Sequence, residues 1–446
     1  MIIICILARL KIIMKRSLTI ILSLVFAGIS AQNSKTIFTS DIDNFWKAYD
    51  QIKKTDDFSK KVNLINELYI SKGTKGLKAF MKARDYNDTA YVKLIDEYPK
   101  FWNSVRPNTL TVQQKNKELN DAVDHLKQIY PELREAGMYF TIGALGAGGT
   151  TVENMVLVGA EIGTGTPDTD TSEFKDDWLK TLFAAQSLDN IVSLNIHEYI
   201  HTQQNGYSKT VLGASIKEGS CDFIGELAVQ RPLQTKYLTY GNAHASQIKD
   251  QFKKEMFTDR LSNWLNNGRK KGESAELGYY IGYEICKSYY QNAKDKKQAV
   301  KDIIELNYSD EKAVEDFLKK SKFFSEKIDK AKLIKEYHDH LLTVVKTDPE
   351  NGAVNINPDT KEIKITFSKE IVPNKYSISL SDKGKENFPI TKITGLENSD
   401  KTLVLSMDLK PGKEYEFVLT NKTFESKDGY PLKDERFIVK FQTKAQ

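Results

Sequence analysis

The stretch Asn195-Ile196-His197-Glu198-Tyr199-Ile200-His201-Thr202 decides the fold of the larger part of this chain. Its two histidines are four positions apart, so on a helix they share one face and can present two imidazole nitrogens to a single metal ion. Glu198 lies beside them and can reach a water on that metal. The helix is expected to begin near Ser187 and to end at Asn205-Gly206, where glycine can adopt the left-handed C′ conformation.

A catalytic zinc site needs a third protein ligand and one open position. The next helical run, Gly213 to Gln230, supplies Glu218 as the best candidate, and the adjacent Gly219 is expected to let the two helices approach closely. Asp222, one turn later, can accept the proton of the far nitrogen of a ligating histidine and thereby fix its tautomer. The sequence therefore predicts one zinc ion per chain, bound by the two histidines and Glu218.

The regions around this motif indicate a mainly helical domain with a small sheet. Residues 33–137 and 171–343 show helical spacing of apolar residues. Between them, Met138–Ile142 and Met155–Gly159 are β-rich runs joined by the glycine-rich segment 143–151. This pattern predicts two paired strands connected by an adaptable turn.

These motifs resemble those of known metallopeptidases. An HExxH motif with a glutamate on the following helix is similar to the gluzincin clan, of which thermolysin is the familiar member. Glu218 followed by Asp222 matches that clan's third ligand and its histidine-orienting aspartate. The closer resemblance, over about residues 40 to 340, is to a bacterial family of predicted zinc-dependent proteases. Four segments carry it: Gly148-Gly149-Thr150 before the strand that ends Val158-Gly159-Ala160-Glu161, His197 to Gln204, Lys217 to Ile224, and Leu277 to Tyr283.

The resemblance implies a zincin-like fold and a zinc ion, while the substrates of that family are largely unassigned. The clan also places an edge strand upstream of the zinc helix, which here implies a substrate strand around residues 148–151. A peptide could add to such a strand through main-chain hydrogen bonds.

Residues 348–446 form a second unit of short alternating runs separated by turns such as Pro411-Gly412 and Asp428-Gly429. About a hundred residues of such strands predict a β-sandwich. The expected strands are 362–367, 376–380, 402–406, 415–419 and 437–441. The segment resembles bacterial Ig-like domains, and it contains no histidine and no residue that we identify as catalytic.

The first residues differ from the rest in composition. Residues 1–31 carry four cations and no acid, then an apolar run from Leu18 to Gly28 and the small residues Ser30-Ala31. This pattern is typical of a secretory signal peptide, and an uncleaved anchor is the alternative. Removal of the four cations lowers the formal net charge of the chain from +5 to +1. Neither nucleic acid nor an anionic membrane is therefore expected as a partner.

Two further questions stay open at the level of sequence. The residue that stabilises the oxyanion could be Tyr279, Tyr280, Tyr283 or His244, although each of these is more often a structural residue. Beyond Cys5 in the leader, Cys221 and Cys286 could form one disulfide, but two buried thiols are the simpler expectation. Cys221 is not expected to bind the metal, because thiolate ligation is unusual in a hydrolytic site with two histidines and a carboxylate.

Together these observations predict an α+β chain: a signal peptide (1–31), a mainly helical zincin-like metallopeptidase domain with a small sheet (32–345), and an all-β Ig-like sandwich (346–446). The expected function is that of an exported zinc metallopeptidase, periplasmic or extracellular. His197, His201 and Glu218 would bind the zinc, Glu198 would act as general base on a zinc-activated water, and Asp222 would orient a histidine.

The expected partner is a peptide or protein substrate, with no membrane span after leader cleavage and with the sandwich as a dock for a partner or a surface. The alternative is a zincin-fold binding or adhesion protein that is catalytically silent or not directed at peptides. The intact Glu198 favours the enzyme, since a purely structural zinc site needs no general base.

Overall fold

A computed structural model describes residues 36–175, 177–184, 186–267 and 275–445. The expected signal peptide lies outside the described residues. Contacts divide the chain into two compact units, the first up to Lys249 and from Asp259 to Ser325, the second Asp250–Thr258 with Glu326 onward. This division does not test the predicted domain limits 32–345 and 346–446, which stay a prediction. Within the described ranges, no helix combines the length and the apolar character that a membrane span requires.

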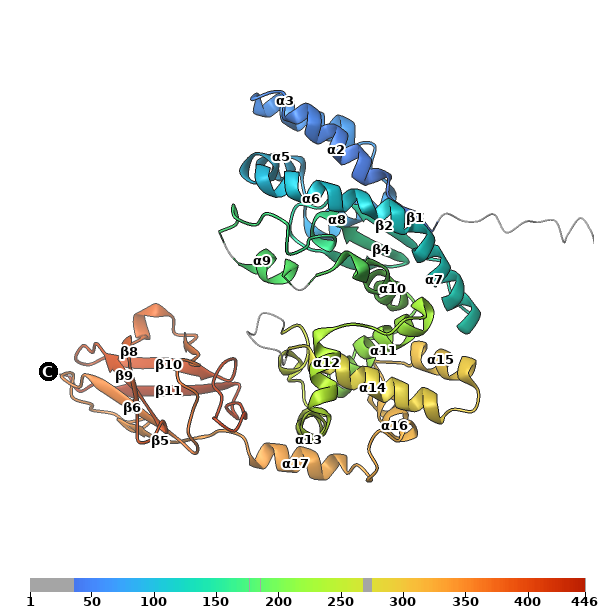
Figure 1. The fold of residues 1–446 in the computed structure, drawn as a ribbon. Coiled ribbons are helices and arrows are strands. Elements are labelled where there is room, and N and C mark those ends of the chain that lie inside the picture. Colours follow the sequence, from blue (N-terminus) through green and yellow to red (C-terminus); the bar gives the residue numbers. More distant parts are fainter. Residues whose placement is uncertain (1–35, 176, 185, 268–274, 446) are drawn as a thin grey trace, which may run out of the picture. The chain divides into compact units, whose positions relative to one another are not determined.

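The first unit begins with helices that enclose an aromatic core. These helices are α2 (Ser40–Ile52), α3 (Phe58–Ile65), α4 (Lys75–Arg84), α5 (Asp88–Glu97), α6 (Pro99–Thr111) and α7 (Asn116–Ile129) (Figure 1). Phe45, Tyr69, Tyr91 and Trp102 are fully buried between them. The ring centroids of Phe45 and Tyr69 lie 5.3 Å apart in an edge-on arrangement. Such aromatic pairs stabilise a core beyond the effect of the apolar area that they bury.

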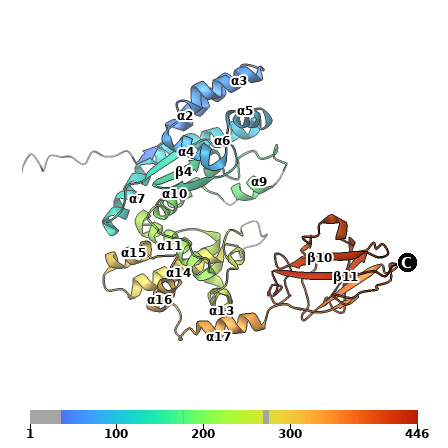
Figure 2. The same cartoon turned by 180° about the vertical axis from the view of Figure 1, so that it is seen from behind.

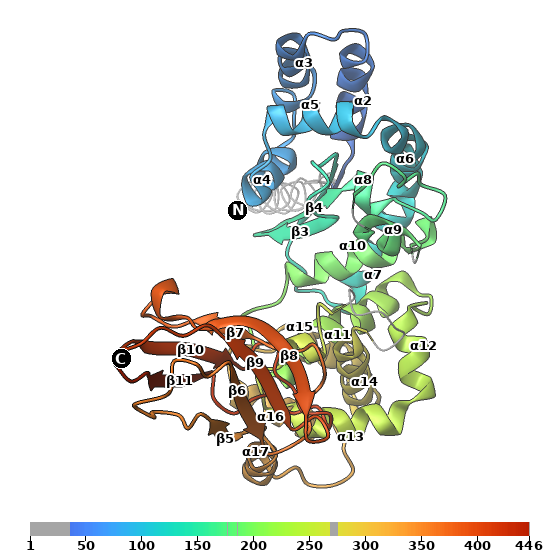
Figure 3. The ribbon, with the colours of Figure 1, turned by 90° about the vertical axis from the view of Figure 1, so that its left-hand side faces the viewer.

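A four-stranded sheet follows, with the order β1-β2-β4-β3. Its strands are β1 (Ile37–Phe38), β2 (Gly137–Thr141), β3 (Gly149–Val152) and β4 (Met155–Gly159). The expected pairing of β2 with β4 is present, but the two strands run parallel. The glycine-rich segment between them is therefore no simple turn, because parallel neighbours require a crossover. That crossover contains β3, which pairs with β4 in antiparallel register and forms the edge of the sheet (Figure 3).

The remaining helices of the first unit follow the sheet in sequence. They are α8 (Ala160–Gly163), α9 (Trp178–Phe183), α10 (Ile191–His201), α11 (Val211–Val229), α12 (Lys236–Ala243), α14 (Leu277–Asn292), α15 (Lys296–Ile304) and α16 (Glu311–Ser321), with α13 (Ala245–Glu255) running from the first unit into the second. Helices α11 and α14 pack against each other and lie side by side in Figures 1 and 2.

Glycine does let helices approach closely, but not the pair that the sequence indicated. A Cβ atom on Gly219 would meet the backbone of Gly282 and Tyr283 on α14. The side of α11 that faces α10 instead carries Gly225, where a Cβ would lie 3.8 Å from Ile196. Gly219 therefore allows a close approach of two helices, as expected, but the second helix is α14 and not α10.

The second unit is a β-sandwich preceded by α17 (Lys330–Asp339). One sheet has the order β11-β10-β7 and the other β5-β6-β9-β8. The strands are β5 (Val344–Asp348), β6 (Glu362–Phe367), β7 (Ile378–Leu380), β8 (Ile390–Glu397), β9 (Thr402–Met407), β10 (Glu414–Thr420) and β11 (Arg436–Gln442). Inward residues such as Ile365, Leu405 and Phe417 form one buried core, as the alternating pattern predicts. All five expected strands are present, whereas β5 and β8 were not expected.

Candidate metal centre

Helix α10 sorts the residues of the HExxH motif between two faces. Ile196, Tyr199 and Ile200 are buried, whereas His197, Glu198 and His201 are only partly covered. The expected start is correct, because the Ser187 side chain accepts a hydrogen bond from the Asp189 amide at the turn that leads into α10.

The expected end of this helix is wrong. The helix stops at His201, before Asn205-Gly206. Gly206 does have a positive φ of 78°. It uses this conformation in the loop beyond, however, where a Cβ would collide with Ser309.

Three potential ligand atoms converge where α10 and α11 face each other. His197 Nε2 lies 3.1 Å from His201 Nε2. Glu218 Oε2 on α11 lies 3.2 Å from His201 Nε2 and 3.6 Å from His197 Nε2. Bonds of about 2.0–2.1 Å at tetrahedral angles would space zinc ligands about 3.3 Å apart. The donor atoms of the expected ligands therefore fit one zinc ion.

Hydrogen bonds on the far side of each ring fix the two histidines. His197 Nδ1 lies 2.7 Å from Asp222 Oδ1, and His201 Nδ1 lies 2.7 Å from Gln204 Oε1. Because both partners are acceptors, each Nδ1 carries a proton, and Nε2 is the nitrogen of each ring that faces Glu218. A metal ion bound by the two Nε2 atoms would take the place of the protons that these nitrogens can carry toward Glu218.

The two orienting side chains are themselves held. Tyr237 of α12 donates to the second oxygen of Asp222 at 2.7 Å. Gln204 donates its amide hydrogens to Lys217 O at 2.9 Å and to Ser220 Oγ at 2.7 Å, both on α11. These bonds leave Oε1 of Gln204 as the atom that faces His201, so the amide orientation follows from its partners.

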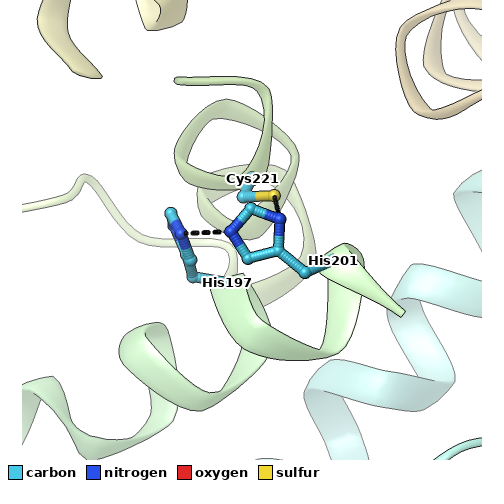
Figure 4. Close-up of side chains that lie close together, drawn as sticks. All are labelled: His197, His201 and Cys221. Atoms are coloured by element: carbon cyan, nitrogen blue, oxygen red, sulfur yellow. Dashed lines mark hydrogen bonds between the residues drawn. The ribbon is translucent and has the colours of Figure 1, made fainter. Parts of the chain in front are cut away.

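Figure 4 shows the Cys221 sulfur beside His201, at the ring nitrogen that does not face His197. Ligand atoms of His197, His201 and Cys221 fall within 4.8 Å of one another, so the thiol is a rival to Glu218. However, its Sγ lies 3.4 Å from His201 Nδ1, the nitrogen that Gln204 already occupies. A metal bound through Cys221 would have to displace that bond, so we favour Glu218. Cys221 and Cys286 are both buried and free.

The electrostatics of this cluster favour positive charge. Burial disfavours a charge on His197, but the carboxylates of Asp222 and Glu218 outweigh burial and raise its pKa well above the ordinary value. Burial likewise opposes ionisation of Glu218, and hydrogen bonds from the two histidines hold its pKa well below the ordinary value. The negative potential that acts on the histidines would act equally on a divalent cation.

Glu198 stands beside the ligand cluster without belonging to it. Its Oε2 accepts a hydrogen bond of 3.0 Å from the Thr151 hydroxyl on β3. No other hydrogen bond to this carboxylate occurs among the described residues. The expected base is therefore connected to the edge of the sheet.

The structure distinguishes the four candidates for oxyanion stabilisation. The Tyr283 hydroxyl donates to Glu226 at 2.9 Å, and His244 is exposed, with Nδ1 at 2.9 Å from Tyr240 O. Tyr280 packs its ring against Gly241. Tyr279 is the candidate nearest the metal ligands, with its ring 6.1 Å from that of His197. Burial, followed by the charge of Glu218, raises the pKa of Tyr279 far above the ordinary value, so its hydroxyl keeps its proton.

Three residues of the site were missed at the level of sequence: Thr151, Gln204 and Tyr237. Gln204 could have been found, because it lies three positions after His201 and so on the same side of the chain. Thr151 and Tyr237 carry no local signal, since their contacts span 47 and 15 positions in the sequence. The assignment of ligands and base stays a prediction that this geometry supports.

Residues 171–310 match the family model of predicted Zn-dependent proteases. This match covers α10, α11 and α14, and with them each proposed metal ligand. Residues 339–443 match the model of the bacterial Ig-like domain, which agrees with the sandwich of the second unit. Both expected family resemblances are thereby confirmed, the first over residues 171–310 of the expected range of about 40 to 340, while the likeness to the gluzincin clan stays a prediction. No curated protein matches the chain.

Several solved structures show a weaker likeness. CopC from Methylosinus trichosporium OB3b is 18% identical over 24% of this chain and 96% of its own, with a TM-score of 0.20. The N-terminal part of the bacterial S-layer protein SbsC is 13% identical over 90% of this chain and 71% of its own, with a TM-score of 0.16. Identities and TM-scores this low carry no functional inference.

Proposed function

We propose that the chain is an exported zinc metallopeptidase whose zinc is bound by His197, His201 and Glu218. The observation that carries the proposal is the convergence of two imidazole Nε2 atoms and one carboxylate oxygen within 3.1–3.6 Å. A site that served only to hold the fold together would be closed by a fourth protein ligand. Here the neighbour of the cluster is Glu198, a carboxylate suited to proton transfer.

When bound, zinc supplies a Lewis acid that activates water and polarises a carbonyl. Glu198 takes a proton from the attacking water and delivers it to the leaving amine. Tyr279, whose hydroxyl stays protonated, donates a hydrogen bond to the carbonyl oxygen as negative charge develops there. Asp222 and Gln204 keep the two imidazoles in the tautomer that leaves Nε2 free.

The proposed substrate is a peptide that pairs with the free edge of β3. Among the residues that the structure describes, this strand pairs on one side only, with β4. An unpaired edge offers main-chain donors and acceptors to an extended chain. The hydroxyl of Thr151 reaches Glu198 from the same strand, so a peptide on this edge would lie beside the base.

The proposed location is the periplasm or the exterior of the cell, on the strength of the cationic and apolar residues 1–31. The Ig-like sandwich would then serve as a dock for a partner or a surface. It contains none of the proposed ligands and no histidine between residues 348 and 446.

Comparison of the wild type with Glu198→Gln tests the proposal. Both proteins should contain equal zinc, because Glu198 is not a ligand. The wild type should cleave members of a broad peptide library, and the variant should be slower by about two to four orders of magnitude. A wild type that binds zinc but cleaves no peptide would instead support the silent binding protein. A variant with wild-type turnover would remove Glu198 from the role of base.

A further inference from the structure

The phase of the hydrogen bonds between β3 and β4 determines which groups face the free edge. The Gly159 amide donates to Gly148 O, and Gly149 stands opposite Val158 in the register. Hydrogen-bonded and non-hydrogen-bonded pairs alternate in an antiparallel ladder. Thr150 therefore directs its main chain toward β4, whereas Gly149 and Thr151 direct theirs to the open side.

One of these outward groups already has a partner. Arg84 of α4 donates to Gly149 O at 3.3 Å, as expected for a carbonyl that points away from β4. The outward main chain of Thr151 is thus the central part of the edge that a peptide could meet. Successive side chains of a strand point to opposite faces, so Thr150 and Thr151 differ in surroundings although they are chemically identical.

The loop before β3 is anchored from behind by a buried carboxylate. Glu161 of α8 is fully buried, and its two oxygens accept hydrogen bonds from the amides of Gly143 (2.8 Å) and Leu145 (3.3 Å). Tyr86 packs on the same loop beside Gly146. These contacts hold the start of β3 in one position, and the pairing with β4 holds its remainder. Thr151 is therefore presented to Glu198 from a rigid element, which is what a precise site requires.

We propose that Thr151 is a positioning residue: its hydroxyl fixes the carboxylate of Glu198 from the strand on which the peptide binds. This inference rests on the proposed function. A glutamate side chain has three rotatable bonds, and within the described residues the hydrogen bond from Thr151 is the one contact that orients this carboxylate. A single hydrogen bond of 3.0 Å from a fixed strand selects one orientation and leaves Oε1 of Glu198 for the proton that it takes.

The test replaces the hydroxyl and keeps the shape. Thr151→Val retains the β-branched side chain and the outward main chain. Loss of a hydrogen bond to a charged group predicts that kcat falls by about tenfold or more. KM should stay within about twofold, and zinc content should equal that of the wild type. Thr151→Ser restores the hydroxyl and should recover most of kcat.

Thr150→Val is the matched control, because it removes the same hydroxyl one position earlier on the opposite face. Because Thr150 belongs to the same strand but its side chain does not reach Glu198, the loss of kcat should be much smaller than in Thr151→Val. In a Glu198→Gln background, Thr151→Val should cause no further loss, since there is no base left to orient. If Thr151→Val does not fold, Thr151→Ser against Thr151→Ala gives the same comparison.

The outcomes separate this inference from the proposed function. Full kcat in Thr151→Val, or equal losses in Thr151→Val and Thr151→Ser, would overturn the role of the hydroxyl while leaving the peptidase intact. An equal loss in Thr150→Val would show a general effect of the strand and would also overturn it. Absence of zinc-dependent cleavage by the wild type, or full activity of Glu198→Gln, would refute the proposed function itself.

Discussion

A Cβ atom built on Gly219 of α11 would lie 2.6 Å from the Cα of Gly282 on α14 and 2.1 Å from the backbone nitrogen of Tyr283. The two helices thus touch through their main chains, directly beside Glu218. A main chain cannot rotate away as a flexible side chain can, so this contact fixes the position of the carboxylate relative to α14. Tyr279 lies on that same helix, one turn before Gly282.

Alanine substitutions at glycines of α11 and α14 should separate the cost of a steric clash between helices from the gain in helix propensity. Gly219→Ala and Gly282→Ala should each destabilise the first unit by about 2 kcal/mol or more, because the added methyl overlaps backbone atoms. Gly225→Ala is the control on α11, where the nearest atom to a new Cβ is 3.8 Å away. It should be neutral or stabilising by up to about 1 kcal/mol through helix propensity. Denaturant unfolding followed by circular dichroism measures all three, and a tolerated Gly219→Ala would contradict the close packing.

The choice between carboxylate and thiolate can be decided by metal content. Glu218→Ala should reduce zinc from about one ion per chain to a small fraction, because only the two histidines would remain. Cys221→Ser should keep full zinc, because Sγ faces the protonated nitrogen of His201. Elemental analysis of the purified variants gives the answer. Zinc lost in Cys221→Ser and retained in Glu218→Ala would reverse the assignment.

The hydrogen bonds behind His197 should show a graded effect on zinc affinity. Asp222→Ala removes the acceptor of Nδ1 and should weaken zinc binding by about 10- to 100-fold. Tyr237→Phe removes only the bond to the far oxygen of Asp222, so its effect should be smaller, under about tenfold. Competition with a chelator of known affinity measures both variants. Equal affinities for wild type and Asp222→Ala would show that the contact does not support the metal.

The buried Glu161 predicts a dependence of stability on pH. Burial raises the pKa of Glu161 to about 7, although the amides of Gly143 and Leu145 act against it. The protonated form is therefore favoured by folding, and the stability that it contributes declines as pH rises from its unfolded pKa to about 7. Between pH 5 and pH 8 the loss should be about 2 kcal/mol.

Glu161→Gln supplies the reference for this prediction, because glutamine does not ionise. Its amide group would face one of the two backbone donors, so the variant should be the less stable protein at acid pH. The difference from the wild type should then shrink toward pH 8. A difference that stays constant from pH 5 to pH 8 would show that Glu161 does not titrate in this range.

Removal of the sandwich should leave zinc binding and cleavage of short peptides intact. All proposed ligands and Glu198 lie in the first unit. Leu342 belongs to the core of the sandwich, so a chain that ends at Asp339 is a cleaner truncation than one that ends near Lys346. Activity on a short peptide, compared at equal zinc occupancy, tests this separation. A truncated protein that is folded and zinc-loaded but inactive would place the sandwich in the active site.

Features that depend on local spacing could be predicted from the sequence. The i, i+4 histidines and the alternating strands of the sandwich follow from the periods of a helix and a strand, and the structure contains both. The direction of β2 against β4 could not be predicted, since a glycine-rich connection fits both a hairpin and a crossover. The short strand β3 lies within this glycine-rich connection, which shows no strand pattern of its own, so only the resemblance to the clan predicts it.

The parts of the site that were missed depend on distant contacts. A threonine in a strand is ordinary, and only the packing of the sheet on α10 brings Thr151 to Glu198. Likewise, nothing near Gly219 in the sequence shows whether it faces α10 or α14. In the structure, Gly282 on α14 completes that contact.

Gln204 links His201 to two groups of α11. The imidazole is thus held from its Nδ1 side by the polypeptide, whatever its Nε2 atom binds. The conformational entropy of ordering this side chain is then lost on folding and not on metal binding, which favours a tight complex with the ion.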